Sequence, residues 1–193
     1  MSVLIFASNN PHKLKEVSAV LAGIITVKSL IEAGYTEEIP ETGNTLEANA
    51  FIKANYVYAK TKTNCFADDT GLFVSALNGE PGVFSARFAG EHCSFQDNIN
   101  KLLLLMKNKI DRSAYFKTVI CLIQNGTEKY FEGIINGTIN DSPKGKNGFG
   151  YDPVFIPEGL TKTFAELSAE EKNSLSHRAA AVKKMKKFLA RDL

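Results

Sequence analysis

Residues 115–135, YFKTVICLIQNGTEKYFEGII, decide the fold class that the sequence predicts. Two runs rich in β-branched and aromatic residues, 115–123 and 129–135, flank the pair Asn125 and Gly126. An Asn-Gly pair between two such runs is typical of a tight hairpin turn. The stretch therefore predicts two neighbouring antiparallel strands.

Outside this hairpin, the sequence predicts further strands and several helices. Short apolar runs at residues 3–7, 64–67 and 154–156 indicate strands. The second of these ends in the polar residues 68–71 and is followed by a short apolar stretch at residues 72–77. Capping residues followed by apolar stripes indicate helices. These helices start near Asn10, near Asn44 or Thr45, at Ser94 and at Ser168, and a last helix carries Ala181, Val182, Met185, Phe188 and Leu189 on one face. We expect an α/β fold with a mixed twisted sheet flanked by helices.

The composition is that of an ordinary globular chain. Its 193 residues include 23 Lys plus Arg and 21 Asp plus Glu, so the net charge is +2. This length favours one domain over residues 1–193, and the near-neutral charge gives no general reason to expect nucleic-acid binding. No apolar run approaches the roughly 20 residues of a membrane-spanning helix. With no signal peptide visible, we expect a cytoplasmic protein.

The first candidate site is the polar stretch Ser8, Asn9, Asn10, Pro11, His12 and Lys13, at the start of the first predicted helix. Hydroxyl, amide and backbone N–H groups at a helix N-terminus attract anions. A lysine in the first turn opposes the helix dipole, so a bound phosphate would offset an unfavourable charge at Lys13. The alternative is that these residues only cap the helix and that the lysine faces solvent.

Asp68, Asp69 and Glu41 form the second candidate site. Carboxylate oxygens are the ligands that Mg²⁺ prefers. Because adjacent residues of an extended chain point in opposite directions, we expect the two aspartates to have different roles. The alternative is that they make turn hydrogen bonds and that Glu41 is solvated. Asp69, Thr70 and Gly71 also spell the tripeptide of aspartic proteases, but that chemistry needs two aspartates, and only one copy is present.

Two more candidate sites lie in the second half of the chain. In residues 144–152, KGKNGFGYD, the glycines let the backbone approach a ligand closely and an aromatic ring can stack on a base. A plain flexible loop is the alternative there. Lys172, His177 and Arg178 gather donors that can bind carbonyl oxygens and phosphates, although a lone histidine is more often structural.

Taken together, these segments resemble the inosine/xanthosine triphosphate pyrophosphatase family. The resemblance rests on SNNPHK (8–13), ETGNT (41–45), DDTGL (68–72), PGVFSARFAG (81–90), NGFGYDPVF (147–155) and SHR (176–178), in this order. One departure is Ala48, where many relatives have glutamate. The resemblance implies two lobes with a central cleft, a homodimer, and hydrolysis of ITP, dITP and XTP between the α and β phosphorus atoms.

The resemblance also implies roles for individual residues. Asp69 would be the catalytic proton acceptor, and Glu41 and Asp69 would hold Mg²⁺. The implied substrate-binding residues are Ser8, Asn9, Asn10, Pro11, His12, Lys13, Lys53, Thr70, Phe149, Gly150, Tyr151, Asp152, Lys172, His177 and Arg178. Donors among them would favour a 6-oxo purine over adenine, because adenine would leave those donors unpaired.

Two other functions stay open from the sequence. A nucleotide-binding sensor would use the same lysines and aromatic rings without turnover. A related pyrophosphatase for modified pyrimidine nucleotides would share the architecture but would not need His177 and Arg178. Substitution of Asp69 distinguishes the first alternative, and a comparison of purine with pyrimidine triphosphates distinguishes the second.

Overall fold

The computed structural model describes residues 2–37 and 39–191. Within this range the chain forms two compact units. Unit 1 holds the residues up to Asp69, then Thr118–Gly133, and the residues from His177 onward. Unit 2 holds Thr70–Lys117 and Ile134–Ser176.

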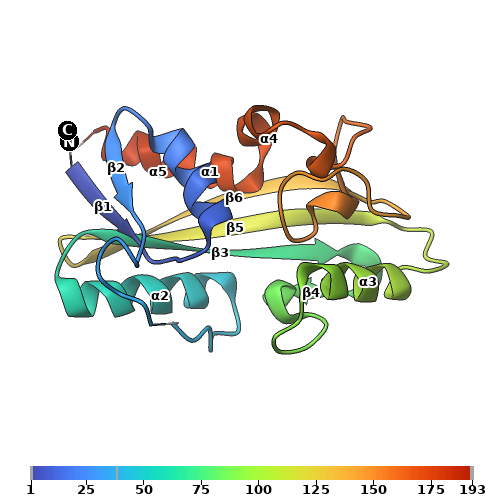
Figure 1. Ribbon diagram of the computed structural model, residues 1–193, viewed down its shortest axis with the longest axis horizontal. Helices are drawn as coiled ribbons and strands as arrows, with labels where there is room; N and C mark the ends of the chain where they lie inside the picture. Colours follow the sequence, from blue (N-terminus) through green and yellow to red (C-terminus); the bar gives the residue numbers. More distant parts are fainter. Residues whose placement is uncertain (1, 38, 192–193) are drawn as a thin grey trace. The chain divides into compact units, whose positions relative to one another are not determined.

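Three strands, β3 (Cys65–Val74), β5 (Ser113–Gln124) and β6 (Thr127–Ile139), supply residues to both units. The other elements of unit 1 are β1 (Ser2–Phe6), α1 (Pro11–Leu21), β2 (Ile25–Lys28), α2 (Leu46–Thr61) and α5 (His177–Leu189). Those of unit 2 are β4 (Pro81–Gly82), α3 (Phe95–Leu105), β7 (Phe155–Pro157), α4 (Ala169–Leu175) and four short 3₁₀ turns (Ser75–Leu77, Ser85–Arg87, Asp152–Val154 and Phe164–Glu166). Figure 1 labels the helices and most of the strands.

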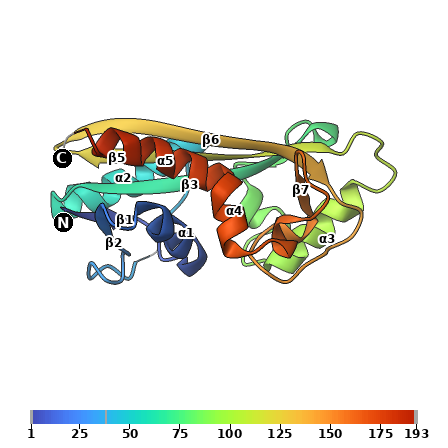
Figure 2. The same cartoon turned by 90° about the horizontal axis from the view of Figure 1, so that it is seen from above.

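The strands pair in the order β2-β1-β3-β5-β6-β7. β1 runs parallel to both β2 and β3, whereas β4 is antiparallel to β3 and β7 is antiparallel to β6. Figure 2 shows β7 beside the end of β6. The predicted mixed sheet flanked by helices is therefore confirmed.

The turn between β5 and β6 is the predicted one. Asn125 and Gly126 have φ values of 51° and 81°. Positive φ at both central residues is what a type I′ hairpin turn requires, and Asn-Gly adopts it at low cost. This turn fixes the pairing of the two longest strands.

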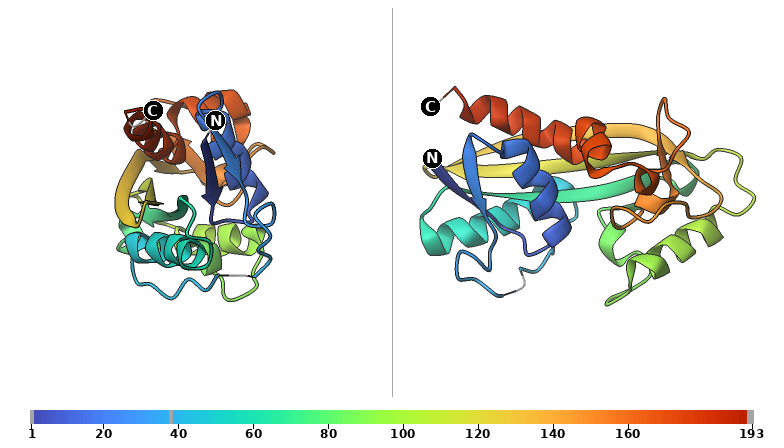
Figure 3. Two further views of the ribbon diagram at one scale, coloured as in Figure 1. Left: turned by 90° about the vertical axis from the view of Figure 1, so that its left-hand side faces the viewer. Right: turned by 45° about the horizontal axis from the view of Figure 1, so that its top comes forward.

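In unit 1 the strands are buried on both faces. Phe66 of β3 and Leu122 of β5 pack with residues of α1 and α5, whereas their neighbours Ala67 and Cys121 pack with residues of α2. Figure 3 shows α1 and α5 on one face of these strands and α2 on the other. Because side chains alternate along a strand, position along β3 decides which helices a side chain meets.

Unit 2 has its own core, built mainly from aromatic rings. The Phe155 ring lies 4.7 Å from the Phe116 ring and 5.3 Å from the Phe164 ring, measured between centroids. Capping boxes start both helices of this unit, at Ser94 for α3 and at Ser168 for α4, as the sequence predicted.

The predicted end of the strand at residues 68–71 is wrong. β3 continues to Val74, so both aspartates lie inside the strand. The strand continues because Leu72 pairs with Gly82 of β4 and because the backbone N–H of Leu72 donates to Ser85 Oγ at 2.8 Å.

In the part of the chain that the structure describes, none of the helices combines the length and apolar character needed to cross a bilayer.

Candidate functional site

Two adjacent carboxylates, Asp68 and Asp69, point to opposite faces of β3. Asp68 shares its face with Phe66 and therefore meets α1 and α5, whereas Asp69 shares its face with Ala67 and meets α2. Their hydrogen bonds follow this division. The two aspartates thus point in opposite directions and have different partners, and the expectation that their roles differ stays a prediction.

Asp68 joins a chain of alternating charges. Its Oδ1 accepts from Lys13 Nζ at 2.9 Å, and its Oδ2 accepts from Arg178 Nε at 2.9 Å. Arg178 Nη1 also donates to Glu16 Oε2 at 2.5 Å. The side chain of Asp68 is 0% exposed and that of Arg178 is 3% exposed. Burial alone would raise the pKa of the Asp68 carboxyl, but Lys13 and Arg178 outweigh burial and hold this pKa well below its usual range.

Asp69 is held by two residues of α2. Its Oδ2 accepts from Asn49 Nδ2 at 3.0 Å, and its Oδ1 lies 3.5 Å from Lys53 Nζ. Lys53 Nζ also donates to Glu41 Oε1 at 2.5 Å. One ammonium group therefore lies between the two carboxylates that the sequence singled out as metal ligands.

The two carboxyl groups titrate in opposite directions. Burial raises the pKa of Asp69, and the nearby charge of Glu41 raises it further, against the lowering effect of Lys53. Burial would also raise the pKa of Glu41, but its close contact with Lys53 lowers it overall. A pair of carboxyl groups with separated pKa values is typical of sites where one group stays charged and the other exchanges a proton.

Glu41 and Asp69 have the chemistry of magnesium ligands. Within residues 2–37 and 39–191 no group of three or more His, Cys, Asp or Glu side chains is placed to hold a metal ion. Mg²⁺ commonly takes only one or two carboxylates and completes its shell with water and substrate phosphates. The position of Lys53 Nζ between both carboxylates shows that this place accommodates positive charge.

The polar stretch before α1 has its hydrogen bonds within the protein. Asn10 caps the helix, because its Oδ1 accepts from the backbone N–H groups of His12 and Lys13 at 3.0 and 3.3 Å. Ser8 Oγ accepts from the backbone N–H of Asn10 at 3.2 Å, and Asn9 Oδ1 accepts from the backbone N–H of Ile31 at 3.1 Å. Pro11 occupies the first position of the helix. The cap is confirmed, and the binding of phosphate by this stretch stays a prediction.

Unit 2 contains a second group of predicted residues. Lys172 Nζ donates to Asp152 Oδ2 at 2.5 Å, and the same oxygen accepts from the backbone N–H of Phe149 at 2.8 Å. Lys172 Nζ also lies 4.9 Å from the centroid of the Phe149 ring. Gly148 is needed here, since a Cβ atom on it would lie 2.0 Å from Asp152 Oδ2. The half-buried ring of Phe149 therefore lies against the buried ion pair between Lys172 and Asp152.

The remaining predicted substrate-binding residues are buried or half-buried in different elements. Tyr151 is only 4% exposed and donates its hydroxyl to Ser85 O at 2.9 Å, so its ring belongs to the core of unit 2. Gly150 follows Phe149 in the same loop, and Thr70 is half-buried in β3. His177 is 3% exposed and opens α5 in unit 1. Their contacts with substrate stay predictions.

Sequence reasoning missed two residues of unit 1, Asn49 and Glu16. Asn49 interrupts the apolar stripe of α2 and is 0% exposed. A polar residue on a predicted buried stripe is a signal that could have been followed, since buried amides need partners. Glu16 carries no comparable signal, because its bond to Arg178 joins segments 162 residues apart.

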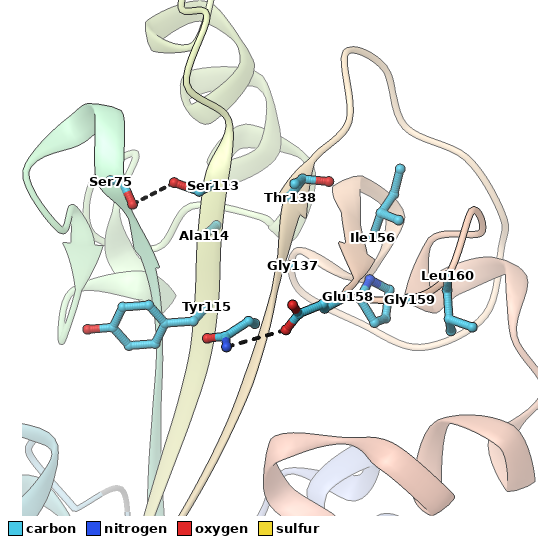
Figure 4. A pocket seen from close by; sticks show the side chains of 12 residues that line it. Ser75, Ser113, Ala114, Tyr115, Gly137, Thr138, Ile156, Glu158, Gly159 and Leu160 are labelled. Atoms are coloured by element: carbon cyan, nitrogen blue, oxygen red, sulfur yellow. Dashed lines mark hydrogen bonds between the residues drawn. The ribbon is translucent and has the colours of Figure 1, made fainter.

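Unit 2 also has a groove of about 490 Å³ on its strands (Figure 4). Ser75 Oγ accepts from Ser113 Oγ at one place on its wall, and Asn136 approaches Glu158 at another. No residue of the predicted site lines this groove.

Comparisons with known proteins show the family of this chain. The sequence profile of the Ham1 family matches residues 4–188. The chain belongs to the Ham1 family. Among Ham1-family relatives, the dITP/XTP pyrophosphatase of Flavobacterium johnsoniae is 52% identical over 182 residues, which cover 94% of this chain and 95% of the relative. The structure of the Staphylococcus aureus Ham1 protein is 39% identical, with a TM-score of 0.89 and full coverage of both chains. A HAM1 protein from Coxiella burnetii is 38% identical, with a TM-score of 0.90 and coverage of 99% of this chain and 100% of that protein.

Proposed function

We propose that this protein hydrolyses dITP, XTP and ITP to the nucleoside monophosphate and pyrophosphate. The observation that carries the proposal is the cluster of Asp69, Lys53 and Glu41, in which a carboxyl group of raised pKa lies against an ammonium group and a second, charged carboxylate. The chain is also about half identical, over nearly its full length, to relatives named dITP/XTP pyrophosphatase.

Binding of the triphosphate falls to the lysines of unit 1. Lys13 and Lys53 carry their charges on elements that meet opposite faces of β3. The side chain of Lys13 is 16% exposed, so part of it is open to a phosphate oxygen while Asp68 holds its ammonium group. A highly charged substrate needs several separated cations, and this pair meets part of that need.

Glu41 and Asp69 would hold Mg²⁺, which supplies positive charge to the phosphate oxygens when it is bound. Glu41 is suited to this role because its lowered pKa keeps it ionised at neutral pH. These two side chains would supply only part of the ligands that Mg²⁺ needs, and water and substrate phosphates would supply the rest.

Asp69 acts as the general base. Its carboxylate accepts a proton from a water molecule, the water oxygen forms a bond to the α phosphorus, and the bond from that phosphorus to the bridging oxygen breaks. Pyrophosphate leaves with the bridging oxygen. The raised pKa of Asp69 makes its carboxylate a stronger base than an exposed aspartate, which favours proton transfer near neutral pH.

Recognition of the base is assigned to donors and to one aromatic ring. A 6-oxo purine presents an acceptor where adenine presents an amino group, so a donor that faces this position would reject adenine by being left unpaired. His177 is the candidate among the predicted donors, since Arg178 Nε and Nη1 already donate to Asp68 and Glu16. Phe149 offers its ring for stacking. Guanine also carries the 6-oxo group, and a donor at this position does not reject it.

We further propose that the protein works in the cytoplasm as a homodimer, the commonest symmetric assembly.

The test is a product assay on purified protein with Mg²⁺ and a panel of triphosphates. We expect pyrophosphate from dITP, XTP and ITP at rates at least tenfold above those from dATP. Orthophosphate as the only product would reject cleavage between the α and β phosphorus atoms. Equal turnover of pyrimidine triphosphates would favour the related pyrimidine enzyme, and tight nucleotide binding without any product would favour the sensor.

A further inference from the structure

Asn49 occupies a buried place between two parts of unit 1. It lies in the first turn of α2 and is 0% exposed. Its Oδ1 accepts from the backbone N–H of Gly43 at 2.8 Å, and its Nδ2 donates to Asp69 Oδ2 at 3.0 Å. One amide therefore joins β3 to the segment that carries Glu41.

The two partners fix which way this amide points. A backbone N–H can only donate, so the oxygen of Asn49 must face Gly43. An ionised carboxylate can only accept, so the NH₂ group must face Asp69. A flipped amide would lose both bonds at a site without access to water, which costs several kcal/mol in general.

Asn49 and Lys53 divide the Asp69 carboxylate between them. They are four residues apart in α2 and therefore lie on the same helix face, one turn from each other. Asn49 holds Oδ2, whereas Lys53 approaches Oδ1. One oxygen of the Asp69 carboxylate is therefore held by Asn49, and the other faces Lys53 and, through it, Glu41.

The Gly43 side of this bridge is equally constrained. A Cβ atom on Gly43 would lie 2.7 Å from Ala48 Cβ and 2.8 Å from Asn49 Oδ1. Only glycine lets the segment approach the helix closely enough for the hydrogen bond to form. The bond holds the chain two residues after Glu41, which limits where that carboxylate can lie.

We propose that Asn49 is a positioning residue for the hydrolytic reaction, which holds one oxygen of the Asp69 carboxylate while the other faces Lys53, and which holds the Glu41 segment at a fixed distance from that carboxylate. The inference rests on the proposed function and deepens it. In this proposal the buried amide of Asn49 sets the distance between the Asp69 and Glu41 carboxylates. Loss of the amide should therefore reduce turnover more than nucleotide binding.

The test variant is Asn49→Asp, which has nearly the same shape. It keeps an acceptor for the Gly43 N–H but has no donor for Asp69. We expect kcat for dITP to fall at least tenfold, with KM changed less than threefold. Calorimetry with a non-hydrolysable α,β-methylene analogue of dITP should give a dissociation constant within threefold of that of the unchanged protein.

Asn98→Asp is the matched control. Asn98 is also in the first turn of a helix, α3, is 2% exposed, and bridges two backbone groups, the carbonyl of Ala86 and the N–H of Ala89. It lies in unit 2 and contacts no predicted site residue in these bonds. Its substitution should lower the unfolding temperature in the same way as Asn49→Asp while leaving kcat within twofold.

These measurements distinguish failure of the positioning role of Asn49 from failure of the proposed function. Unchanged kcat in Asn49→Asp, or a loss of analogue binding that equals the loss of kcat, overturns the positioning role. Absence of pyrophosphate from the unchanged protein instead overturns the proposed function. If Asn49→Asp does not fold, Gly43→Ala tests the same hydrogen bond from its other end, and an unchanged kcat in that variant overturns the inference.

Discussion

Arg178 binds Asp68 through a 2.9 Å contact between Nε and Oδ2, although the two residues are 110 positions apart in the sequence. The contact joins α5 to β3, and Asp68 in turn holds Lys13 of α1. Three segments of unit 1 therefore meet at one buried carboxylate. Since Lys13 is a proposed phosphate ligand, the pairing places a substrate-binding group on a rigid support.

Asp68→Asn should strongly destabilise the protein. It removes the one negative charge that both Lys13 and Arg178 contact, and breaking a buried ion pair costs about 3–5 kcal/mol. Chemical denaturation at pH 7 measures the loss. Glu16→Gln is the control, because the side chain of Glu16 is 14% exposed and contacts only Arg178 in the bonds described above, so its effect should be smaller.

The contribution of Asp68 should also depend on pH. Its pKa is lower in the folded protein than the value of about 3.9 in an unfolded chain. The stabilisation is therefore complete above about pH 4 and is lost as the pH falls below it. The difference in unfolding free energy between the unchanged protein and Asp68→Asn should shrink in acid, and a difference that grows instead would contradict the assignment.

Gly133→Ala should displace α5. A Cβ atom on Gly133 would lie 2.1 Å from the carbonyl oxygen of His177 and 2.6 Å from the backbone nitrogen of Ala181. Overpacking of this kind costs about 1–3 kcal/mol, and the shift should also weaken the Arg178 contact with Asp68. Ile134→Ala, at a neighbouring side chain that is 47% exposed, should leave the unfolding temperature nearly unchanged.

Phe149→Leu should weaken nucleotide binding without abolishing catalysis. Stacking of a base on an aromatic ring is worth about 1–3 kcal/mol, so KM for dITP should rise on the order of tenfold. Steady-state kinetics measure the change. Tyr115→Leu removes another partly exposed ring of unit 2, which stacks on Phe73, and should not alter KM. Equal KM values for all three proteins would remove Phe149 from the base site.

The cysteines should react very unequally in the folded protein. Burial raises the pKa of Cys65 to about 12 and that of Cys121 to about 11, so neither thiol forms appreciable thiolate near neutral pH. Cys93 is only half-buried. Titration with a chromogenic disulfide reagent at pH 8 should label one thiol per chain rapidly and all three after unfolding. Rapid labelling of two or three thiols in the folded protein would contradict the burial.

The sequence predicted local features well, because local features are encoded by neighbouring residues. The Asn125–Gly126 turn and the capping boxes at Ser94 and Ser168 each need only residues a few positions apart. The end of β3 was mispredicted because the strand continues through pairing with Gly82, which lies beyond the local window. Acidic residues usually mark a strand end, but here helices on both faces supply their partners.

In the candidate site, too, the sequence predicted local features better than contacts between distant residues. Alternation along a strand was enough to predict that Asp68 and Asp69 have different partners. The identity of these partners, Arg178 and Asn49, depends on how distant segments pack, and no spacing in the sequence encodes that. Glu41 was a candidate metal ligand from its carboxylate chemistry, whereas the role for Lys53 came only from the family resemblance. The structure adds that the two side chains contact each other.

The central claim, that Asp69 directs water to the α phosphorus, is tested most directly by hydrolysis of dITP in ¹⁸O-labelled water. Mass spectrometry of the products locates the new oxygen. The account predicts the label in the monophosphate and none in the pyrophosphate, with no labelled product from Asp69→Asn. Label in the pyrophosphate would mean attack at the β phosphorus and would contradict the account.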